Sequence, residues 1–500
     1  MGRSAMATQR KKPGPEPQRA TGPQELAESF AKAIRSGRLG AGAQLPTIRA
    51  LAAEIGTTRA NVLAAYRLLQ RQGLVEGVVG RGTSVRRDLA IEPRGPSGVA
   101  FSPAARAALV GMARPEPRSR LPEGQQLVAD FGPGAPDQEL FPVREFETSL
   151  ARVLASRGGE LLGYGAPNGE ADLKCALARR SDATGDEILI TNGAQQGLDL
   201  VLRAFCGGTS KGQGSVLVPS PTYHHFIDLA RVHGLEVVPI PTGNDGIDLE
   251  ALARELPRAQ LVYVMPTFHN PTGRTLSEAQ RTAFMAVVGK THVPVLADEF
   301  QEELRFAGTP SARFRTFDPR GLTLTVHTFS KGLFPGVRIG WLEAPRRLLA
   351  PIAALKRLCD LETSPLLQAA LADFLGSGVL DRHLQALREQ LASRHAAAQR
   401  VLTTTMPTGS SWTKPEGGFS LWLELPGATD PERVLGLCAA RGVLMTPGRV
   451  FDPLDRSIAA FRISLAQVTK AEIEAGLAIV GECAHECLSG SAPIPSPLFL

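Results

Sequence analysis

Reactive and charged side chains follow several apolar runs in the C-terminal part of the chain. Asp298 comes directly after residues 295–297, and Lys331 closes a Thr-Phe-Ser-Lys segment that follows another apolar run. Arg338 comes shortly after the lysine. A lysine amine bonds reversibly to carbonyl carbons, a carboxylate keeps a ring nitrogen protonated, and an arginine binds anions. These residue types together indicate a site for an aldehyde that also carries an anionic group.

Three further segments add groups that such a ligand would need. Small residues open a helical segment after residues 188–191, where backbone N–H groups can bind a phosphate. Tyr223 offers an aromatic ring, and Asn270, in His-Asn-Pro-Thr-Gly, offers an amide. A single lysine after a strand is usually a solvated strand end, and the Asn270 segment alone could be only a turn. The six pieces occur together in strand order, however, and they predict a site for pyridoxal 5′-phosphate.

The apolar runs alternate with helical patterns, which is typical of an α/β fold with a mostly parallel sheet covered on both faces. In such a sheet, ligands bind outside the carboxyl ends of the strands. After Pro351 the pattern changes to long helices with few strands, which indicates a smaller α+β lobe. The expected strands are 187–191, 215–219, 236–240, 261–265, 293–297 and 322–327 in the sheet, and 420–425 and 461–465 in the smaller lobe.

The positive charge of the 500-residue chain is concentrated near its N-terminus. Residues 1–95 hold 16 Lys and Arg against 7 Asp and Glu, so they carry +9, and the other 405 residues carry −3 of the total of +6. A basic head on an acidic body indicates a polyanion as partner of the head alone. No run of about 18 apolar residues occurs, so we expect no membrane span. The six cysteines lack CxxC spacing, which is typical of reduced cytosolic thiols, and we expect no metal site.

The basic head has the pattern of a helix-turn-helix followed by a hairpin. Apolar residues at helical spacing predict helices over 26–34 and 48–55, and a third that Thr57 or Thr58 can cap. Residues 74–79 and 83–85 form the predicted hairpin, with a basic tip. Thr58, Arg59 and Asn61 open the third helix, where a recognition helix meets base edges. A small bundle with a solvated basic face explains the helical spacing equally well, but the charge and the basic hairpin favour DNA binding.

Two further segments have compositions typical of disorder and of linkers. Residues 1–22 are basic, polar and rich in proline, and we expect a disordered tail. Residues 89–127 are rich in Arg, Pro and Ala and form a predicted linker, with one short helix near 103–112. We therefore expect a DNA-binding domain over 23–88 and an effector-binding and dimerisation domain over 128–490. The smaller lobe of that domain would consist mainly of 128–160 and 351–490.

The head resembles a known family of DNA-binding domains. Residues 26–85, which include LPTIRALAAEIGTTRANVLAAYRLLQRQGLVEG and GRGTSV, are similar to the winged-helix head of GntR-type bacterial transcription regulators. The resemblance implies that double-stranded operator DNA is the partner. It also implies that the DNA contacts are made by Arg49, Arg59, Asn61, Gly80 and Arg81.

The body resembles fold-type I aminotransferases over roughly residues 128–480, through HNPTG, ADEF and TFSKGLFPGVRIGW. By motif position, the resemblance implies that Lys331 forms the Schiff base with pyridoxal 5′-phosphate and that Asp298 is the partner of its ring nitrogen. The other roles that it implies are these: Asn270 faces the phenolic oxygen, Tyr223 stacks on the ring, Gly193, Ala194, Gln195, Ser330 and Arg338 hold the phosphate, Tyr164 reaches the neighbouring subunit's phosphate, Arg462 binds the α-carboxylate of the effector, and Gly134 lies on the arm over the site.

One position departs from the pattern of these aminotransferases. Two residues after Asp298, they carry a tyrosine whose hydroxyl bonds the phenolic oxygen of the cofactor, and here that residue is Phe300. Without this donor, Asn270 is the only expected partner of the phenolic oxygen, which changes the pKa of the bound aldimine and weakens proton transfer. We therefore expect the cofactor to bind but efficient transamination to be impaired.

Together the two halves resemble the MocR subfamily of GntR-type regulators. The resemblance implies a homodimeric, cytoplasmic bacterial regulator. In it, an amino-acid-like effector displaces Lys331 and forms an external aldimine, and the altered lobe closure passes through the linker to the DNA-binding heads. Two alternatives stay open. In the first, the chain is a working aminotransferase that also binds DNA. In the second, its body is a dimerisation scaffold that has lost the cofactor, and the intact Lys331 argues against this second alternative.

Overall fold

The computed structural model describes residues 22–35, 39, 43–71, 74–78, 82–85, 102–112, 121–122, 124–206, 214–243 and 245–489. The chain divides into two units, Met1–Arg114 and Pro115–Leu500. Among the helices in these ranges, none combines the length and the apolar character that a membrane span requires.

The N-terminal unit is a three-helix winged helix-turn-helix. Its core contains Ile34, Leu51, Val62 and Val85, so all three helices and the hairpin contribute to it. The helices and the hairpin confirm the sequence prediction, and a further short helix lies within the predicted linker, where one was expected. The elements are α1 (Pro23–Arg35), α2 (Ile48–Glu54), α3 (Arg59–Arg71), the antiparallel pair β1 (Val75–Val78) and β2 (Gly82–Val85), and α4 (Pro103–Met112).

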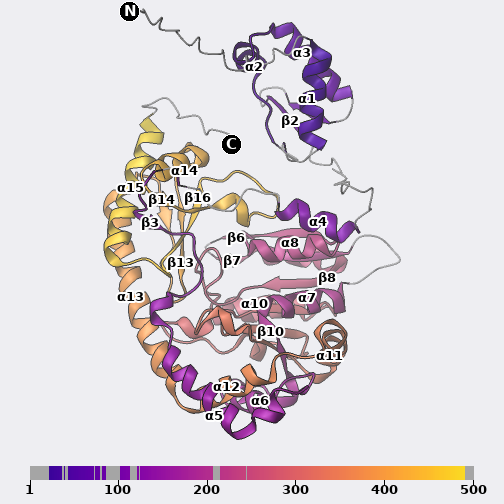
Figure 1. Ribbon diagram of the computed structural model, residues 1–500, viewed down its shortest axis with the longest axis vertical. Helices are drawn as coiled ribbons and strands as arrows, with labels where there is room; N and C mark the ends of the chain where they lie inside the picture. The colour runs from indigo at the N-terminus through magenta and orange to yellow at the C-terminus, as the bar shows by residue number, and fades with distance from the viewer. Residues whose placement is uncertain are drawn as a thin grey trace, which may run out of the picture. The chain divides into compact units, whose positions relative to one another are not determined.

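An eight-stranded sheet with the order β4-β11-β10-β9-β8-β5-β6-β7 lies at the centre of the C-terminal unit (Figure 1). The strands from β10 to β6 in this order are parallel, whereas β11 runs antiparallel to both of its neighbours. The six expected strands are present, and β7 and β11 are additional. The strands are β4 (Ile188–Thr191), β5 (Ser215–Ser220), β6 (Glu236–Gly243), β7 (Gly246–Ile247), β8 (Ala259–Val264), β9 (Val295–Asp298), β10 (Thr323–Thr328) and β11 (Gly340–Glu343).

Helices cover both faces of this sheet, as the continuous apolar runs predicted. Along β5, Val216 and Val218 belong to one core cluster, which includes residues of α7 (Gly193–Phe205), α8 (His224–Val232) and α11 (Arg346–Asp360). Leu217 points the other way, into a second cluster with residues of α9 (Leu249–Glu255) and α10 (Glu278–Val288). A strand that is buried on both faces leaves only its ends for ligands.

A helical group packs at the end of the unit away from α14 and α15 (Figure 1). It consists of α5 (Val143–Leu161), α6 (Ala171–Ala178) and α12 (Pro365–Gly376). Val153 and Leu161 of α5 pack against Ala369 and Ala370 of α12, and α12 also contributes to a cluster with β4 and β11. The residues of α5, which the sequence grouped with the smaller lobe, therefore pack beside the large sheet because their apolar face is covered by α12.

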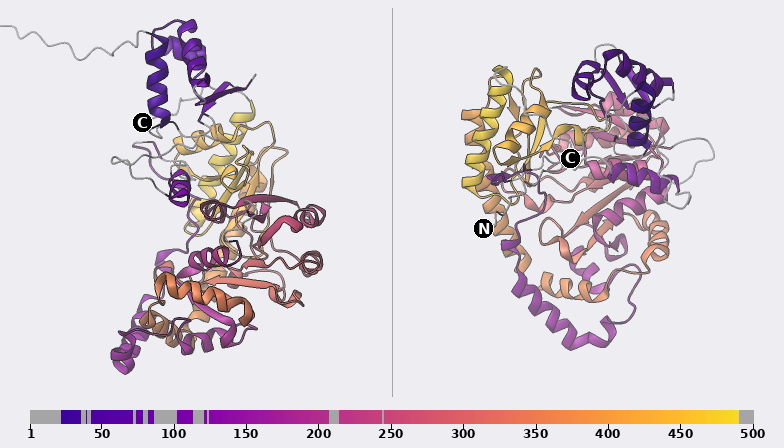
Figure 2. Two further views of the ribbon diagram at one scale, coloured as in Figure 1. Left: turned by 90° about the vertical axis from the view of Figure 1, so that its right-hand side faces the viewer. Right: turned by 45° about the horizontal axis from the view of Figure 1, so that its top comes forward.

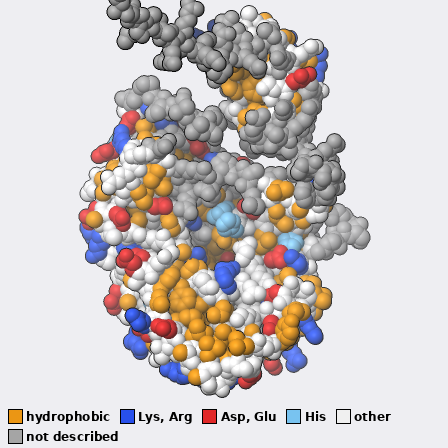
Figure 3. All heavy atoms as spheres, in the orientation of Figure 1, with side chains coloured by type: hydrophobic (Ala, Val, Ile, Leu, Met, Phe, Trp, Pro, Cys, Tyr) orange, Lys and Arg blue, Asp and Glu red, His pale blue; other side chains and the backbone are white. Residues whose placement is uncertain are grey.

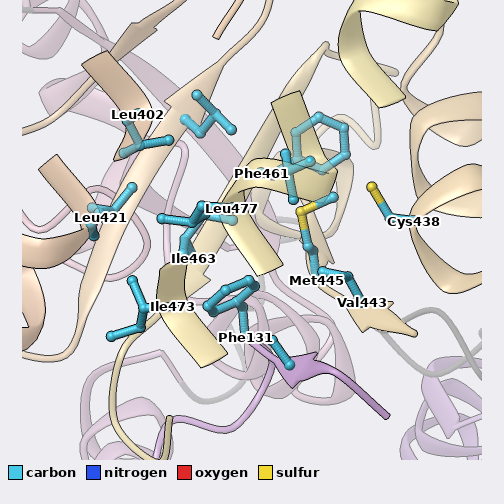
Figure 4. Packing of buried hydrophobic residues seen from close by; sticks show 14 of the residues in the cluster. Phe131, Leu402, Leu421, Cys438, Val443, Met445, Phe461, Ile463, Ile473 and Leu477 are labelled. Carbon is cyan, nitrogen blue, oxygen red and sulfur yellow. The ribbon is translucent and has the colours of Figure 1, made fainter. Parts of the chain in front are cut away.

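The smaller lobe contains a four-stranded antiparallel sheet, β12-β13-β16-β15, and the parallel pair β14-β3. Its core is shown in Figure 4 and includes Phe131, Leu402, Phe461 and Leu477. Two long helices, α13 and α15, lie side by side along it in the views of Figures 1 and 2. The elements are β3 (Ala129–Asp130), α13 (Val379–Thr405), β12 (Ser411–Trp412), β13 (Ser420–Glu424), α14 (Pro431–Ala440), β14 (Val443–Leu444), β15 (Thr446–Pro447), β16 (Ala460–Ser464) and α15 (Lys470–Ser489).

The core of the smaller lobe makes a testable contribution to stability. Leu477 is fully buried, whereas Leu358 on α11 is 87% exposed. Leu477→Ala should lower the free energy of unfolding by about 3 kcal/mol, because a buried leucine loses contacts and leaves a cavity, and Leu358→Ala should change it by less than about 0.5 kcal/mol. Denaturant titration of both variants measures the difference, and equal losses would contradict this packing.

Candidate functional site

Strand pairing brings the predicted cofactor residues to one edge of the large sheet. The carboxyl ends of parallel β10, β9, β8 and β5 lie together, and Asp298 is the last residue of β9. Gly340, the first residue of antiparallel β11, pairs with Thr328 at the end of β10 and with Thr191 at the end of β4. The segments that follow β4, β5, β8 and β10 therefore start at this same edge, and they carry Gly193, Tyr223, Asn270 and Lys331.

Asp298 is buried and keeps one carboxylate oxygen available. The Tyr263 hydroxyl in β8 donates a hydrogen bond to Oδ2 at 2.8 Å, whereas Oδ1 has no hydrogen-bond partner among the described residues. Burial raises the pKa of Asp298 to about 6, although the Tyr263 hydrogen bond and the charge of His327 favour the ionised form. A hydrogen bond from a cationic donor to Oδ1 would therefore stabilise the ionised form of this buried carboxylate.

Lys331, the predicted nucleophile of the site, lies close to the segment that precedes α5. Its Nζ donates to the carbonyl oxygen of Gly134 at 2.6 Å. Burial and the charge of Arg462 lower the pKa of Lys331 to about 8, and Asp298 acts in the opposite direction. A lysine with this pKa is neutral in a substantial fraction of molecules near pH 7.5, which is the form that attacks a carbonyl carbon.

Arg462 in β16 is buried and holds the segment that leads to Gly134. Its Nη2 donates to the Gly132 carbonyl oxygen at 2.6 Å and to Thr446 Oγ1 at 3.3 Å. Its Nη1 donates to the amide oxygen of Asn270 at 3.4 Å. Asn270 therefore uses its amide oxygen toward Arg462, so its amide nitrogen is the group that can donate to a ligand oxygen.

The turn between β4 and α7 forms a cradle whose floor is backbone. Gly193 has a φ of +74°, which residues with a side chain rarely adopt. A Cβ there would also lie 2.7 Å from Nη2 of Arg338, so this position favours glycine. The Arg338 Nη2 donates to the carbonyl oxygen of Asn192 at 3.4 Å. A Cβ on Gly340 would lie 2.7 Å from the Ala194 nitrogen, so α7 begins directly beside the sheet edge. The predicted phosphate-binding residues at this edge are Gly193, Ala194, Gln195, Ser330 and Arg338.

The two predicted tyrosines differ in their burial. Tyr223 is half-buried at the start of α8, and its ring meets the His224 and His225 rings edge-on, with 5.5 Å between centroids in each case. Tyr164 is 88% exposed, so it is not part of the site of its own chain. Its predicted contact with a neighbouring subunit stays a prediction.

Phe300 packs against the core cluster that contains Tyr263, and it offers no donor to a ligand. The Tyr263 hydroxyl does not replace the missing tyrosine, because it is already bonded to Asp298. We did not single out Tyr263 from the sequence, although it is one of only four tyrosines and lies in the strand next to β9.

A buried charged cluster that the sequence analysis missed lies on β10 and the segments around it. His327 of β10 has Nδ1 3.5 Å from Glu302 and Nε2 3.7 Å from Glu343, and its ring stacks on Trp341. Burial opposes the charge of His327, but the two carboxylates outweigh it and raise its pKa to about 9. The resulting imidazolium favours the ionised form of Asp298 on the neighbouring strand. The expected strand 322–327 includes His327, but the sequence does not show which charged groups lie against its side chain.

Three features of the site fit pyridoxal 5′-phosphate. Oδ1 of Asp298 is a buried acceptor that can receive a hydrogen bond from a protonated pyridine nitrogen. The glycine floor at Gly193 lets backbone N–H groups at the N-terminus of α7 approach a phosphate. The Lys331 amine, with its lowered pKa, can bond the aldehyde carbon.

In the N-terminal unit, the turn between α2 and α3 has the expected geometry. Gly56 has a φ of +67°, which ends α2 at low cost. Thr58 caps α3, because its hydroxyl accepts a hydrogen bond from the Asn61 N–H at 3.2 Å. The Asn61 side chain also donates to Thr57 Oγ1 at 3.1 Å, which fixes its direction at the start of the helix.

The predicted DNA-contacting residues are only partly described. Arg49 of α2 and Arg59 at the start of α3 are both exposed, as a DNA contact requires. Gly80 and Arg81 at the tip of the hairpin lie outside the described residues. The assignment of individual DNA contacts stays a prediction.

Comparison with known proteins agrees with this two-unit arrangement. Residues 128–480 match the family described as aminotransferase class I and II, and residues 24–85 match bacterial regulatory proteins of the gntR family. The chain belongs to the aminotransferase class I and II family. It carries a GntR-type helix-turn-helix domain in addition, and this fusion is that of the MocR subfamily of regulators.

Relatives with both units are named as regulators. The uncharacterized HTH-type transcriptional regulator YdcR of Escherichia coli is 30% identical over 89% of this chain and 94% of its own length, and the HTH-type transcriptional regulator TauR of Rhodobacter capsulatus is 29% identical over 91% and 94%. Aromatic-amino-acid aminotransferase 1 of Thermococcus litoralis is 30% identical over 73% of this chain and 90% of its own. The chain is thus a DNA-binding transcription regulator with an aminotransferase-like unit.

Solved aminotransferases share the fold of the C-terminal unit. Kynurenine aminotransferase of Pyrococcus horikoshii, solved with PMP, aligns with a TM-score of 0.69 at 28% identity, over 73% of this chain and 92% of its own. The α-aminoadipate aminotransferase LysN of Thermus thermophilus, solved with a phosphopyridoxyl-leucine adduct, gives 0.67 at 28% identity, over 72% and 92%. The C-terminal unit therefore has the fold of aminotransferases that bind pyridoxal phosphate derivatives.

The raised pKa of Asp298 predicts a pH-dependent stability of the cofactor-free protein. The folded chain binds this proton more tightly than the unfolded chain, since the pKa is about 6 instead of 3.8, so stability falls as the pH rises from about 4 to 6. Asp298→Asn removes this cost, and the variant should exceed the wild type by about 3 kcal/mol above pH 7 and by nothing near pH 4. Urea unfolding at both pH values measures the difference, and a gap independent of pH would contradict the assignment.

Proposed function

We propose that the aminotransferase-like unit binds pyridoxal 5′-phosphate and senses a primary amine of the amino-acid class, and that this binding controls operator affinity. The observation that carries the proposal is that half-buried Lys331 and buried Asp298 lie at one edge of the large sheet, where buried Arg462 of the smaller lobe reaches Asn270, in a chain that also has a GntR-type domain. The individual site residues take the roles predicted from the sequence.

A bound pyridoxal 5′-phosphate supplies an aldehyde carbon that primary amines join reversibly. Asp298 holds the proton of the ring nitrogen, and Tyr263 fixes the direction of the carboxylate. The lowered pKa of Lys331 means that its neutral amine would be available to bond the aldehyde carbon of the cofactor. Arg462 selects effectors that carry a carboxylate. Phe300 offers no hydroxyl near the reacting atoms, so proton transfer after effector binding is slow and sensing dominates over turnover.

The segment Gly132–Gly134, which we name the arm, gives the effector a way to act on the linker. Arg462 donates to the carbonyl oxygen of Gly132, Lys331 to that of Gly134, and Ser464 Oγ to that of Pro133 at 2.5 Å. An effector carboxylate would compete with the Gly132 carbonyl for Arg462, and Lys331, whenever it is not bonded to the cofactor, would donate to the Gly134 carbonyl as it does here. Effector binding thus changes the partners of a segment that follows the predicted linker within a few residues in the chain.

A homodimer is part of this proposal. Apolar side chains gather over the lower half of the C-terminal unit, where α5 and α12 lie (Figure 3). Leu154, Leu162 and Tyr164 are among the exposed hydrophobic residues of this region. Such an area is larger than single scattered apolar residues and suits a subunit interface. A dimer places two DNA-binding units on paired half-sites.

The visible absorbance of the cofactor-loaded protein tests the function. Titration with a panel of amino acids and other primary amines should shift the absorbance band for one carboxylate-bearing amine, without release of a 2-oxo acid. Lys331→Ala should lack the resting band, because it has no amine to bond the cofactor, and should keep its operator affinity in the absence of effector. A wild-type protein without any visible absorbance band would contradict the proposed cofactor. Sustained release of a 2-oxo acid would favour a working aminotransferase that binds DNA.

The arm is tested separately through Ser464, which is 1% exposed and touches Pro133 rather than the effector. Ser464→Ala should leave the effector-induced absorbance shift within about twofold of wild type and should reduce the effect of the effector on operator affinity by about tenfold, a loss of about 1.4 kcal/mol of coupling. Ser411→Ala, which removes an exposed hydroxyl bonded to Glu424, is the matched control. Full coupling in Ser464→Ala would show that the arm does not carry the signal.

A further inference from the structure

Asp360, the last residue of α11, accepts hydrogen bonds from residues at both ends of the first turn of α7. Its Oδ2 accepts hydrogen bonds from the Asn192 amide nitrogen and from the Gln196 amide nitrogen, each at 2.6 Å. Asn192 immediately precedes Gly193, and Gln196 lies one turn further along the helix. One carboxylate therefore fixes the residue before the cradle and the residue after it.

The two residues that Asp360 holds also fix the backbone of the turn. The Gln196 amide oxygen accepts a hydrogen bond from the Asn192 N–H at 2.7 Å, and the Asn192 carbonyl oxygen accepts one from Arg338 at 3.4 Å. Both backbone groups of Asn192 are thus used inside this network. The consequence is that the directions of the next N–H groups, from Gly193 onward, and the position of Arg338 depend on Asp360.

A buried lysine keeps the carboxylate in place. Lys356 is fully buried one turn before Asp360 on α11, and its Nζ lies 3.0 Å from Oδ1 and 3.2 Å from Oδ2. A buried cation needs a close counter-charge, and Asp360 is the carboxylate that lies against Lys356. The pair places the Asp360 carboxylate beside the N-terminus of α7, whose N-cap residue Asn192 makes no side-chain capping hydrogen bond.

The segment after Asp360 is held from the other side. Leu361 has a φ of +64°, which a leucine adopts only when its surroundings enforce it. Glu362 accepts a hydrogen bond from the Gly165 N–H at 2.5 Å, next to the exposed Tyr164. The chain on both sides of Asp360 is therefore held, by Asn192 and Gln196 at the cradle and by Gly165 through Glu362.

We propose that Asp360 is a positioning residue for the phosphate of the cofactor. It acts through Asn192 and Gln196, which it aligns so that the N–H groups of the α7 N-terminus and the guanidinium of Arg338 converge on one anion. No atom of Asp360 needs to touch the cofactor. This inference rests on the proposed binding of pyridoxal 5′-phosphate.

Comparison of pyridoxal 5′-phosphate with pyridoxal, which has the aldehyde and the ring but no phosphate, tests the assignment. In Asp360→Asn, a neutral amide replaces the carboxylate whose Oδ2 alone receives three donors. The dissociation constant of pyridoxal 5′-phosphate, followed by absorbance of the full chain, should rise at least about tenfold, whereas that of pyridoxal should stay within about twofold of wild type. Gln196→Ala, which leaves the Lys356 pair intact, should show the same selective loss and serves if Asp360→Asn does not fold.

Glu474→Gln is the matched control, because Glu474 of α15 pairs with Arg400 of α13 away from the cradle, and it should bind both compounds as the wild type does. Equal losses for pyridoxal and its phosphate in Asp360→Asn would indicate a merely structural role and would overturn the inference. Unchanged affinity for the phosphate in Asp360→Asn or in Gln196→Ala would overturn it as well. A wild type that binds neither compound would instead contradict the proposed function.

Discussion

The site depends on bringing an amine and a carboxylate at the edge of the large sheet together with a buried guanidinium from the smaller lobe. Each of these charges loses hydration, so each shifts toward its neutral form or needs a partner. Lys331 loses proton affinity, Asp298 gains it, and Arg462 is held by a backbone carbonyl and two side chains. The large sheet makes this arrangement possible because antiparallel β11 brings the cradle and the lysine to the same edge as the aspartate.

Charge separates the two units as clearly as their folds do. The first 95 residues carry +9, which supplies salt-dependent attraction to DNA, and the remaining chain carries −3. On the face of the C-terminal unit in Figure 3, acidic and basic side chains are interspersed, with no broad basic area in the described part. The positive charges that matter for a small anionic ligand, Lys331 and Arg462, are turned inward instead.

The sequence predicts the parallel strands and the site motifs because each is a local signal. Apolar runs mark β5, β8, β9 and β10, and polar residues follow them at the edge. It misses β11, because Gly340–Glu343 is short and directly follows the site segment, and it misses Asp360, which reaches Asn192 only through tertiary packing. His327 and Tyr263 were missed for the same reason, since neither residue type nor spacing shows which face of a strand a side chain occupies.

The central claim is that amine binding in the aminotransferase-like unit and operator binding are coupled. Thermodynamic linkage requires that the coupling be reciprocal. The direct measurement uses the cofactor-loaded full chain with an operator selected from random-sequence DNA. The effector changes the operator dissociation constant by some factor, and saturating operator must change the effector dissociation constant, read from absorbance, by the same factor. We predict equal factors of at least about fivefold, and an effector that binds without altering operator affinity would contradict the account.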